Sequence, residues 1–227
     1  MGKKRTRQTG ALSFSASSLS RIYQRLFECH GPQHWWPGDT PFEIMLGAVL
    51  TQNTTWSNVE QAIANLKAIG PLEPHAILQL GQDELATALC PSGYFNVKAK
   101  RLRALCEFLL EHPDLEQLED QELRARFLAV HGIGPETADD ILLYAYNRSV
   151  FVIDTYTRRL FTRLGLVEGK PGYETLRQGF EQALLADAAL FNEYHALIDH
   201  HAKQVCRPKP DCKNCCLNSH CKQCIDK

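Results

Sequence analysis

Apolar residues recur at helical spacing along almost the whole of this 227-residue chain. Leu19, Ile22 and Leu26 lie three and four positions apart, as expected for the buried stripe of a helix. One short apolar run at 150–153 resembles a strand, but a single run cannot form a sheet. The chain is therefore predicted to be all-α. Besides this first helix and one around 59–66, helices are predicted over residues 83–90, 97–111, 121–130, 135–147, 155–165, 173–186 and 189–205.

The amino-acid composition and the terminal segments exclude few classes of protein other than membrane-spanning ones. The chain is 44% hydrophobic and 22% charged, which is ordinary for a globular protein, and no apolar run reaches the roughly 18 residues of a membrane-spanning helix. Residues 1–17 begin with Met1-Gly2-Lys3-Lys4. The Ser-rich stretch that follows favours a disordered basic arm over a myristoylation or secretion signal.

Basic residues are grouped, although the formal net charge is only −1. Residues 200–227 contain six Lys or Arg and two Asp, a local charge of +4. Segregated charge of this kind supports nucleic-acid binding, although each cluster alone is typical of a solvated helix face. Two further clusters consist of Lys98, Lys100, Arg101 and Arg103, and of Arg158, Arg159 and Arg163.

The most informative segment joins two predicted helices. Gly132 and Gly134 flank Ile133, and glycines permit positive φ or close backbone approach in a tight turn. Pro135 suits the first turn of the next helix. The N–H groups and dipole of such a helix start bind a phosphate without reading base sequence. A plain helical turn is the alternative for this motif by itself.

Asp154 lies at a second predicted helix start, directly after the apolar run 150–153. Taken by itself, this residue is most simply a helix N-cap.

Together these segments resemble a known signature. Gly132-Ile133-Gly134 with Thr137-Ala138, followed by Val152-Ile153-Asp154-Thr155, resembles the helix–hairpin–helix and Gly-Pro/Asp motif of the endonuclease III superfamily of DNA glycosylases. Residues 46–54 and 93–100 resemble two more segments of that family, in the family's order. The resemblance implies an all-helical base-excision-repair enzyme that acts on double-stranded DNA with a damaged base.

The resemblance also implies roles for individual residues. Asp154 is implied as the catalytic carboxylate, because cleavage of an N-glycosidic bond develops oxocarbenium character that a carboxylate stabilises. The target base must leave the stack, and Gln52 is implied as the side chain that fills the gap. A polar surface residue at a helix end is the alternative for Gln52. Gly132, Ile133 and Gly134 are implied as DNA contacts.

Glu136 departs from the bifunctional members of the family. They carry a Lys at this position, and its amine forms a Schiff base with the sugar and drives strand cleavage. A carboxylate cannot form that imine. With Asp154 and Glu136 as the catalytic carboxylates, we therefore predict a monofunctional glycosylase that leaves the abasic site intact.

Glu136 and the sequence Trp35-Trp36-Pro37 are most similar to the 3-methyladenine DNA glycosylase III branch, which acts on alkylated purines. Such bases are cationic and stack on aromatic faces. Trp35, Trp56 and Lys203 fall where this branch has its base pocket. Ordinary core packing is the alternative for either tryptophan.

Six of the nine cysteines lie in the last 22 residues, and without a secretion signal this crowding indicates a metal site. The set Cys206, Cys212, Cys215 and Cys221 resembles the family's [4Fe–4S] loop, although its first gap is one residue short. Structural zinc is the alternative, and the spare Cys216 and Cys224 could exchange with the ligands. The cluster would staple a basic loop carrying Arg207 and Lys209 near the phosphates.

The other cysteines and three histidines are predicted to be structural. Cys29, Cys90 and Cys106 lie in apolar helical settings and are expected to be buried thiols. His195, His200 and His201 are expected to pack or to face solvent rather than bind metal.

The expected architecture is two helical lobes with a DNA cleft between them, which Asp154 faces. Residues 41–153 form a barrel that carries the hairpin, and residues 18–40 with 154–227 form the lobe with the cluster loop. We expect a monomer in the cytoplasm, associated with the nucleoid through DNA and not with a membrane. Three alternatives remain: a glycosylase and lyase for oxidised pyrimidines or mismatches, a non-catalytic iron–sulfur lesion sensor, and a zinc-stapled structural protein.

Overall fold

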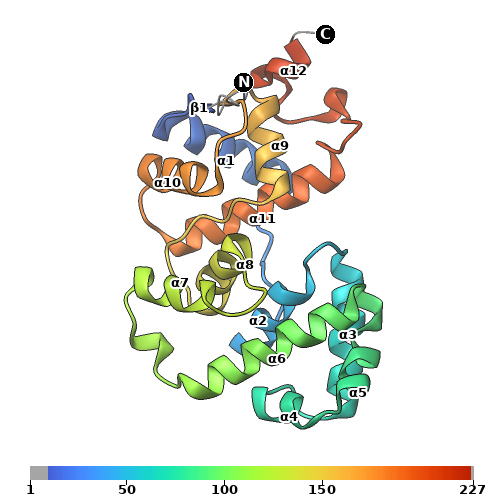
Figure 1. Cartoon of the computed structure of the whole chain (residues 1–227). Helices are drawn as coiled ribbons and strands as arrows, with labels where there is room; N and C mark the ends of the chain where they lie inside the picture. The colour runs from blue at the N-terminus through green and yellow to red at the C-terminus, as the bar shows by residue number, and fades with distance from the viewer. Residues whose placement is uncertain (1–9, 226–227) are drawn as a thin grey trace, which may run out of the picture. The chain divides into compact units, whose positions relative to one another are not determined.

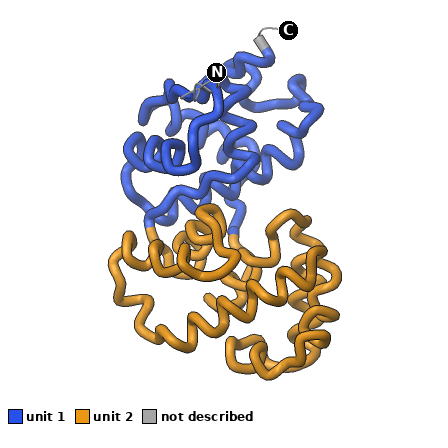
Figure 2. The backbone as a smooth tube through the Cα atoms, viewed as in Figure 1, with its two compact units in different colours: residues 1–35, 149–227 blue, residues 36–148 orange. Residues whose placement is uncertain are grey.

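The computed structural model describes residues 10–225 of the chain. In this part the secondary structure is helical except for one pair of two-residue strands, so the predicted all-α class is confirmed (Figure 1). Among the same residues, every helix is too short or too polar to cross a bilayer. The chain divides into two compact units (Figure 2): unit 2 is residues 36–148, and unit 1 is the described part of 1–35 and 149–227.

Unit 2 is a continuous run of helices. In it α6 packs against α2, α4 and α5, and α8 packs against α7 (Figure 1). Its elements are α2 (Pro41–Leu50), α3 (Trp56–Ile69), α4 (Pro74–Gln79), α5 (Gln82–Ala88), the 3-10 turn η1 (Cys90–Ser92), α6 (Phe95–Glu111), the 3-10 turn η2 (Leu115–Gln117), α7 (Asp120–Leu128), α8 (Pro135–Asp140) and the π-helix η3 (Ile141–Ala145).

Helix α2 was absent from the helices predicted by periodicity. Thr40 caps it and Pro41 begins it, but its residues from Met45 to Leu50 are all buried. A helix that is buried on every side has no polar face, and therefore no amphipathic stripe by which a pattern search could find it.

Unit 1 is built around the long helix α11, which packs against α1 and α9. Its core is aromatic: the Phe151 and Phe180 rings stack at 4.3 Å, and Phe161 and Tyr194 pack edge-on around them. Its elements are β1 (Ala11–Leu12), α1 (Ala16–His30), α9 (Thr155–Arg163), β2 (Val167–Glu168), α10 (Tyr173–Ala183), α11 (Ala188–Gln204), the 3-10 turns η4 (Cys212–Asn214) and η5 (Asn218–His220), and α12 (Lys222–Ile225).

Part of the predicted N-terminal arm, residues 10–17, is ordered. Residues 1–9 lie outside the described residues, but residues 10–17 are ordered and not a disordered arm. Leu12 pairs with Val167 in the small antiparallel sheet, and the Phe14 ring lies 4.8 Å from Phe180. Ser15 then caps α1 through a capping box with Ser18. The contacts of the half-buried Phe14 ring with Phe161 and Phe180 offset the entropy lost by ordering this polar stretch.

The borders between the two compact units lie a few residues before those predicted from the sequence, at 35/36 and 148/149 and not at 40/41 and 153/154. Trp36 packs on Trp56 and Tyr144, so unit 2 already includes residue 36. Near the second border, the Phe151 N–H donates to Glu181 and its ring stacks on Phe180, so this apolar run belongs to unit 1.

Candidate active site and metal centre

The predicted hairpin lies in unit 2 between α7 and α8. The backbone turns at Gly132, whose φ of 87° favours glycine, and the Arg101 side chain leaves no room there for a Cβ. Gly134 instead has an extended backbone, and no described side chain lies against it. Pro135 begins α8, and no side chain in the described structure caps this helix start. The predicted turn geometry therefore depends on one glycine.

Gln52 is bonded to this hairpin. Its Nε2 donates to the Gly132 carbonyl at 3.2 Å and to Thr137 Oγ1 at 3.0 Å, while its Oε1 accepts from the Arg101 guanidinium. The next residue, Asn53, has a φ of 56°, a left-handed conformation that Asn tolerates. Two segments that are 80 residues apart in the sequence thus form one polar group, and every amide atom of Gln52 is engaged.

Lys98 supports the same region from inside unit 2. The side chain is buried, and its Nζ donates to the carbonyls of Leu50 at 2.8 Å and of Ser92 at 2.6 Å. Burial, followed by the charge of Arg101, lowers the Lys98 pKa to about 8. The ammonium thus closes the end of α2, two residues before Gln52. Sequence reasoning placed Lys98 in a surface cluster and missed this role.

Several side chains of the two internal basic clusters donate hydrogen bonds to backbone carbonyls of the protein. In the first, Arg103 donates to the carbonyls of Leu78 and Leu80, in addition to the buried Lys98. In the second, Arg159 and Arg163 both donate to the Cys206 carbonyl. These side chains do not simply lie on a solvated helix face, because they satisfy carbonyls at the ends of helices and in loops.

Asp154 is the N-cap of α9 in unit 1. Its Oδ1 accepts from the Thr157 N–H at 2.6 Å, which leaves Oδ2 3.9 Å from His195 Nε2 on α11. The side chains of Asp154 and His195 are 13% and 9% exposed. The capping interpretation is thus correct and still leaves one carboxylate oxygen for other chemistry. Sequence reasoning missed His195 as its neighbour, because 41 positions separate the two residues.

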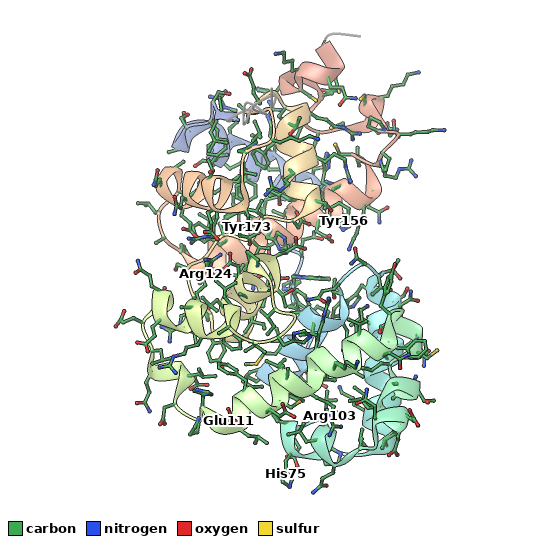
Figure 3. The ribbon with its side chains drawn as sticks, in the orientation of Figure 1. His75, Arg103, Glu111, Arg124, Tyr156 and Tyr173 are labelled. Carbon is green, nitrogen blue, oxygen red and sulfur yellow. The ribbon has the colours of Figure 1, made fainter. Side chains whose placement is uncertain are left out.

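Lys203 lies beside two aromatic rings in unit 1. Its Nζ is 5.9 Å from the Trp35 ring centre and 5.6 Å from that of Tyr156, which Figure 3 labels, and 2.8 Å from Asp199. Such distances are typical of cation–π contact. The structure thus brings together two of the three predicted pocket residues and adds Tyr156, which follows Asp154 by two positions.

The third predicted pocket residue, Trp56, belongs to unit 2. Its ring packs edge-on against Trp36 at 5.3 Å, and its Nε1 donates to Glu60 at 2.9 Å. Glu136 is exposed in the first turn of α8. Trp36 is the aromatic residue of this unit that sequence reasoning left out, and its adjacency to Trp35 was the available signal.

Comparison with known proteins identifies the family. Residues 46–184 match the model of the HhH-GPD superfamily of base excision DNA repair proteins. The chain belongs to this superfamily, and is a DNA glycosylase of base excision repair. It is 44% identical over 209 residues to a Methanocaldococcus jannaschii protein named as a DNA repair glycosylase, covering 89% of this chain and 95% of that one. It is 30% identical to endonuclease III of Sulfolobus acidocaldarius, covering 82% and 83%.

Solved structures agree with this assignment. The H. pylori 3-methyladenine DNA glycosylase MagIII, bound to 1,N6-ethenoadenine, is 30% identical and covers 83% of this chain and 95% of its own, with a TM-score of 0.70. An endonuclease III–DNA complex superimposes with a TM-score of 0.81 over 94% of this chain and 98% of its own, at 18% identity, which establishes the shared fold alone.

Five of the six C-terminal cysteines of this glycosylase line one cavity, whose space of about 310 Å³ includes open solvent. The four predicted ligands line it together with Cys224 and apolar residues such as Leu160 and Leu217. Arg163 Nη1 lies 3.2 Å from Cys206 Sγ, and His201 Nε2 lies 3.5 Å from Cys215 Sγ. Four thiols, two nitrogen donors and an apolar wall fit an anionic iron–sulfur cluster.

The same cavity separates the two adjacent cysteines. Cys215 lines it, whereas Cys216 is not among the lining residues and interacts with Cys29. Burial, the largest cause, raises the Cys215 pKa to about 11, and the charges of Cys206, Cys221 and Cys212 act in the same direction. A bound cation is what would deprotonate such a thiol at neutral pH.

The structure corrects one group of expectations about thiols. Cys106 is buried as predicted, but Cys29 and Cys90 are exposed. Cys29 is the penultimate residue of α1 and Cys90 begins η1, so both lie at helix ends, where a helical stripe no longer predicts burial. Among the histidines, His195 and His201 are buried, which agrees with a packing role.

Proposed function

We propose that this glycosylase is monofunctional and removes alkylated purines such as 3-methyladenine from double-stranded DNA. The observation that carries the substrate assignment is the pair of aromatic faces of Trp35 and Tyr156, over which the structure already holds a cation, Lys203 Nζ. Electron-rich faces that attract an ammonium group also favour a cationic base. The likeness to MagIII, whose bound ligand is a modified adenine, supports the same class.

The chemistry follows from the charge of the leaving group. When the C1′–N bond of an N-alkylated purine breaks, its electron pair goes to the cationic base, which departs neutral and needs no proton donor. Positive charge develops on the sugar, where the free Oδ2 of Asp154 stabilises it. A water molecule then adds to C1′ and loses its proton to the carboxylate. His195 Nε2 lies 3.9 Å from Oδ2, beyond hydrogen-bond distance, and is a titratable neighbour of this oxygen.

The absence of a lyase step rests on Glu136. The Glu136 side chain is a carboxylate and cannot form an imine with the sugar. The amine of Lys203 forms an ion pair with Asp199 at 2.8 Å. We therefore propose that the product is an intact abasic site.

Gln52 and the hairpin complete the proposal on the DNA side. Gln52 is proposed to fill the gap left by the flipped base, and the hairpin from Gly132 to Gly134 to contact a phosphate. The bonds from Gln52 to Gly132 and Thr137 would position it for this step. We propose that the protein works as a cytoplasmic monomer.

A [4Fe–4S] cluster on Cys206, Cys212, Cys215 and Cys221 would cross-link the end of α11 to the loop that follows it. The exposed Arg207 and Lys209 on this loop are proposed to approach phosphates. Cys224, which also lines the cavity, is the fifth thiol at this site.

The test is incubation of the purified protein with methylated duplex DNA, with released bases identified by chromatography and strand breaks scored before and after alkali. We expect release of 3-methyladenine and breaks only after alkali. Asp154→Asn is the matched control, because Asn caps a helix as well as Asp does. Intact methylated bases after incubation would overturn the substrate assignment.

A second candidate substrate class is the oxidised pyrimidines or mismatched bases, with lyase activity. It is favoured by the 30% identity to endonuclease III of S. acidocaldarius. A covalent adduct trapped by borohydride, formed as fast as turnover, would establish it in place of our proposal. Base binding without release by the wild type, unchanged in Asp154→Asn, would instead indicate a lesion sensor.

A further inference from the structure

A second group of metal-binding side chains lies beside the cysteine loop. Cys29 and His30, the last two residues of α1, meet Cys216, which directly follows the cluster ligand Cys215. One ligand atom from each of these three side chains lies within 4.8 Å of the other two. None of the three lines the cavity of the iron–sulfur cluster. We propose that Cys29, His30 and Cys216 bind one Zn²⁺ ion, separate from the cluster.

The ligand chemistry selects zinc. Two thiolates and one imidazole form a soft and compact set, and a solvent molecule would complete a tetrahedron. Around zinc, tetrahedral geometry with bonds of about 2.3 Å to sulfur and about 2.0–2.1 Å to nitrogen spaces the ligand atoms about 3.5–3.8 Å apart. The distances between ligand atoms, at most 4.8 Å now, therefore need to shorten by about 1.3 Å at most. An iron–sulfur cubane, a larger body with four thiolate ligands, does not fit three side chains this close.

Local contacts hold the ligands in place before metal arrives. The Arg25 guanidinium, one turn before Cys29 on α1, donates to the Cys216 carbonyl at 3.3 Å. This bond fixes the loop against the end of the helix. Cys29 is exposed, and His30 and Cys216 are partly exposed, so an ion can reach the group from solvent.

A chain of two histidines decides which nitrogen of His30 is available. His201 Nε2 faces Cys215 Sγ at 3.5 Å, and His201 Nδ1 faces His30 Nε2 at 2.9 Å. When Cys215 is a cluster thiolate it accepts a hydrogen bond, so His201 donates from Nε2 and its Nδ1 must be an acceptor. His30 then donates from Nε2, and its Nδ1 carries a lone pair. The neutral tautomer that results is the one a metal requires.

The zinc ion would therefore join three elements: the end of α1, the cysteine loop and, through His201, a ligand of the cluster. Its structural effect is to tether the N-terminal helix to the loop. This is a further device for a loop that has short 3-10 turns and little apolar core of its own.

The experiment measures metal content of the full-length protein, purified without oxygen from zinc-containing medium. We expect about one zinc for each chain in addition to about four irons. Zinc-edge X-ray absorption should show two sulfur ligands at about 2.3 Å and nitrogen or oxygen ligands at about 2.0–2.1 Å. In Cys29→Ser and in His30→Gln the zinc should fall at least tenfold, with iron and cluster absorbance unchanged. Cys90→Ser, an exposed cysteine in unit 2, is the matched control and should retain both metals.

Four results would each overturn the site. Zinc could be absent while Cys29 and Cys216 are recovered as free thiols, or the two could be recovered as a disulfide by alkylation and mass spectrometry. Iron could be lost in Cys216→Ser, which would make Cys216 a cluster ligand. Zinc could show four sulfur ligands and disappear in Cys212→Ser but not in Cys29→Ser, which would place it in the cluster cavity. None of these readouts depends on the substrate or on lyase activity.

Discussion

The hairpin region of unit 2 and the cysteine loop of unit 1 are held in shape by different forces. The hairpin lies on helices that share a large apolar core, and Gln52 and Lys98 satisfy backbone carbonyls inside it. The cysteine loop follows α11 with two 3-10 turns and one four-residue helix, and Arg159 and Arg163 donate to its carbonyls. The hairpin should therefore persist without metal, whereas the loop should not.

The largest expected effect on structure comes from removing one predicted cluster ligand from the cysteine loop. In Cys212→Ala we expect iron to be lost and residues 205–225 to become unprotected, because a loop with so small a core depends on its metal. Hydrogen exchange read by mass spectrometry should show this change while residues 36–148 keep their protection. Cys224→Ser is the control that should retain iron. Equal loss of protection in both units would contradict the comparison.

Asp154→Asn should reduce activity most among variants that keep the fold. We expect base release to fall about 10²–10³-fold, since a preorganised charge beside the sugar is lost. The melting temperature should hardly change, because Asn accepts the Thr157 N–H as Asp does. Single-turnover base release and thermal melting are the two measurements. A large drop in melting temperature with a proportionate loss of activity would show that Asp154 serves only as the N-cap of α9.

Lys98→Met tests the hairpin side of the comparison. Removing the ammonium leaves the carbonyls of Leu50 and Ser92 buried without their donor, which costs about 1–3 kcal/mol for each group. We expect the free energy of unfolding to fall by several kcal/mol on this scale, with the cysteine loop and its iron unaffected. Urea unfolding and iron content measure the two halves of this statement.

The pH dependence of the same residue has a definite sign. The pKa of Lys98 is lowered from 10.5 to about 8 in the folded protein, so between these values the unfolded chain binds the extra proton. Stability of the wild type should therefore rise relative to Lys98→Met as pH increases from about 8 to 10.5. Unfolding midpoints of both proteins at pH 7.5 and 10 measure the difference. A difference in stability between the two proteins that stays constant or shrinks with pH would show that folding does not lower the pKa of Lys98.

The smallest effect is expected at the aromatic faces. Trp35→Leu removes one face of the Lys203 contact, and we expect alkylpurine release to weaken through KM by a few fold, on the order of 1 kcal/mol. Trp56→Leu, in unit 2, is the comparison variant. If Trp35→Leu changed kcat alone, the ring would serve chemistry and not base binding.

The sequence by itself determined the fold class, the hairpin turn at Gly132, the helix start at Asp154 and the family. These features depend on local order: apolar spacing, a glycine with positive φ and a capping side chain are written in consecutive residues. The cysteine spacing likewise predicted four of the five thiols that line the cavity.

Only the tertiary structure decided which distant side chains meet. It ordered residues 10–17 by packing Phe14 on Phe180, turned Lys98 inward and placed His195 beside Asp154. It also assigned the adjacent Cys215 and Cys216 to different neighbours, the cavity and Cys29. Such contacts arise from packing between segments up to about 190 positions apart in the sequence. A local sequence pattern does not predict them, because residues of every type occur both in the interior and on the surface.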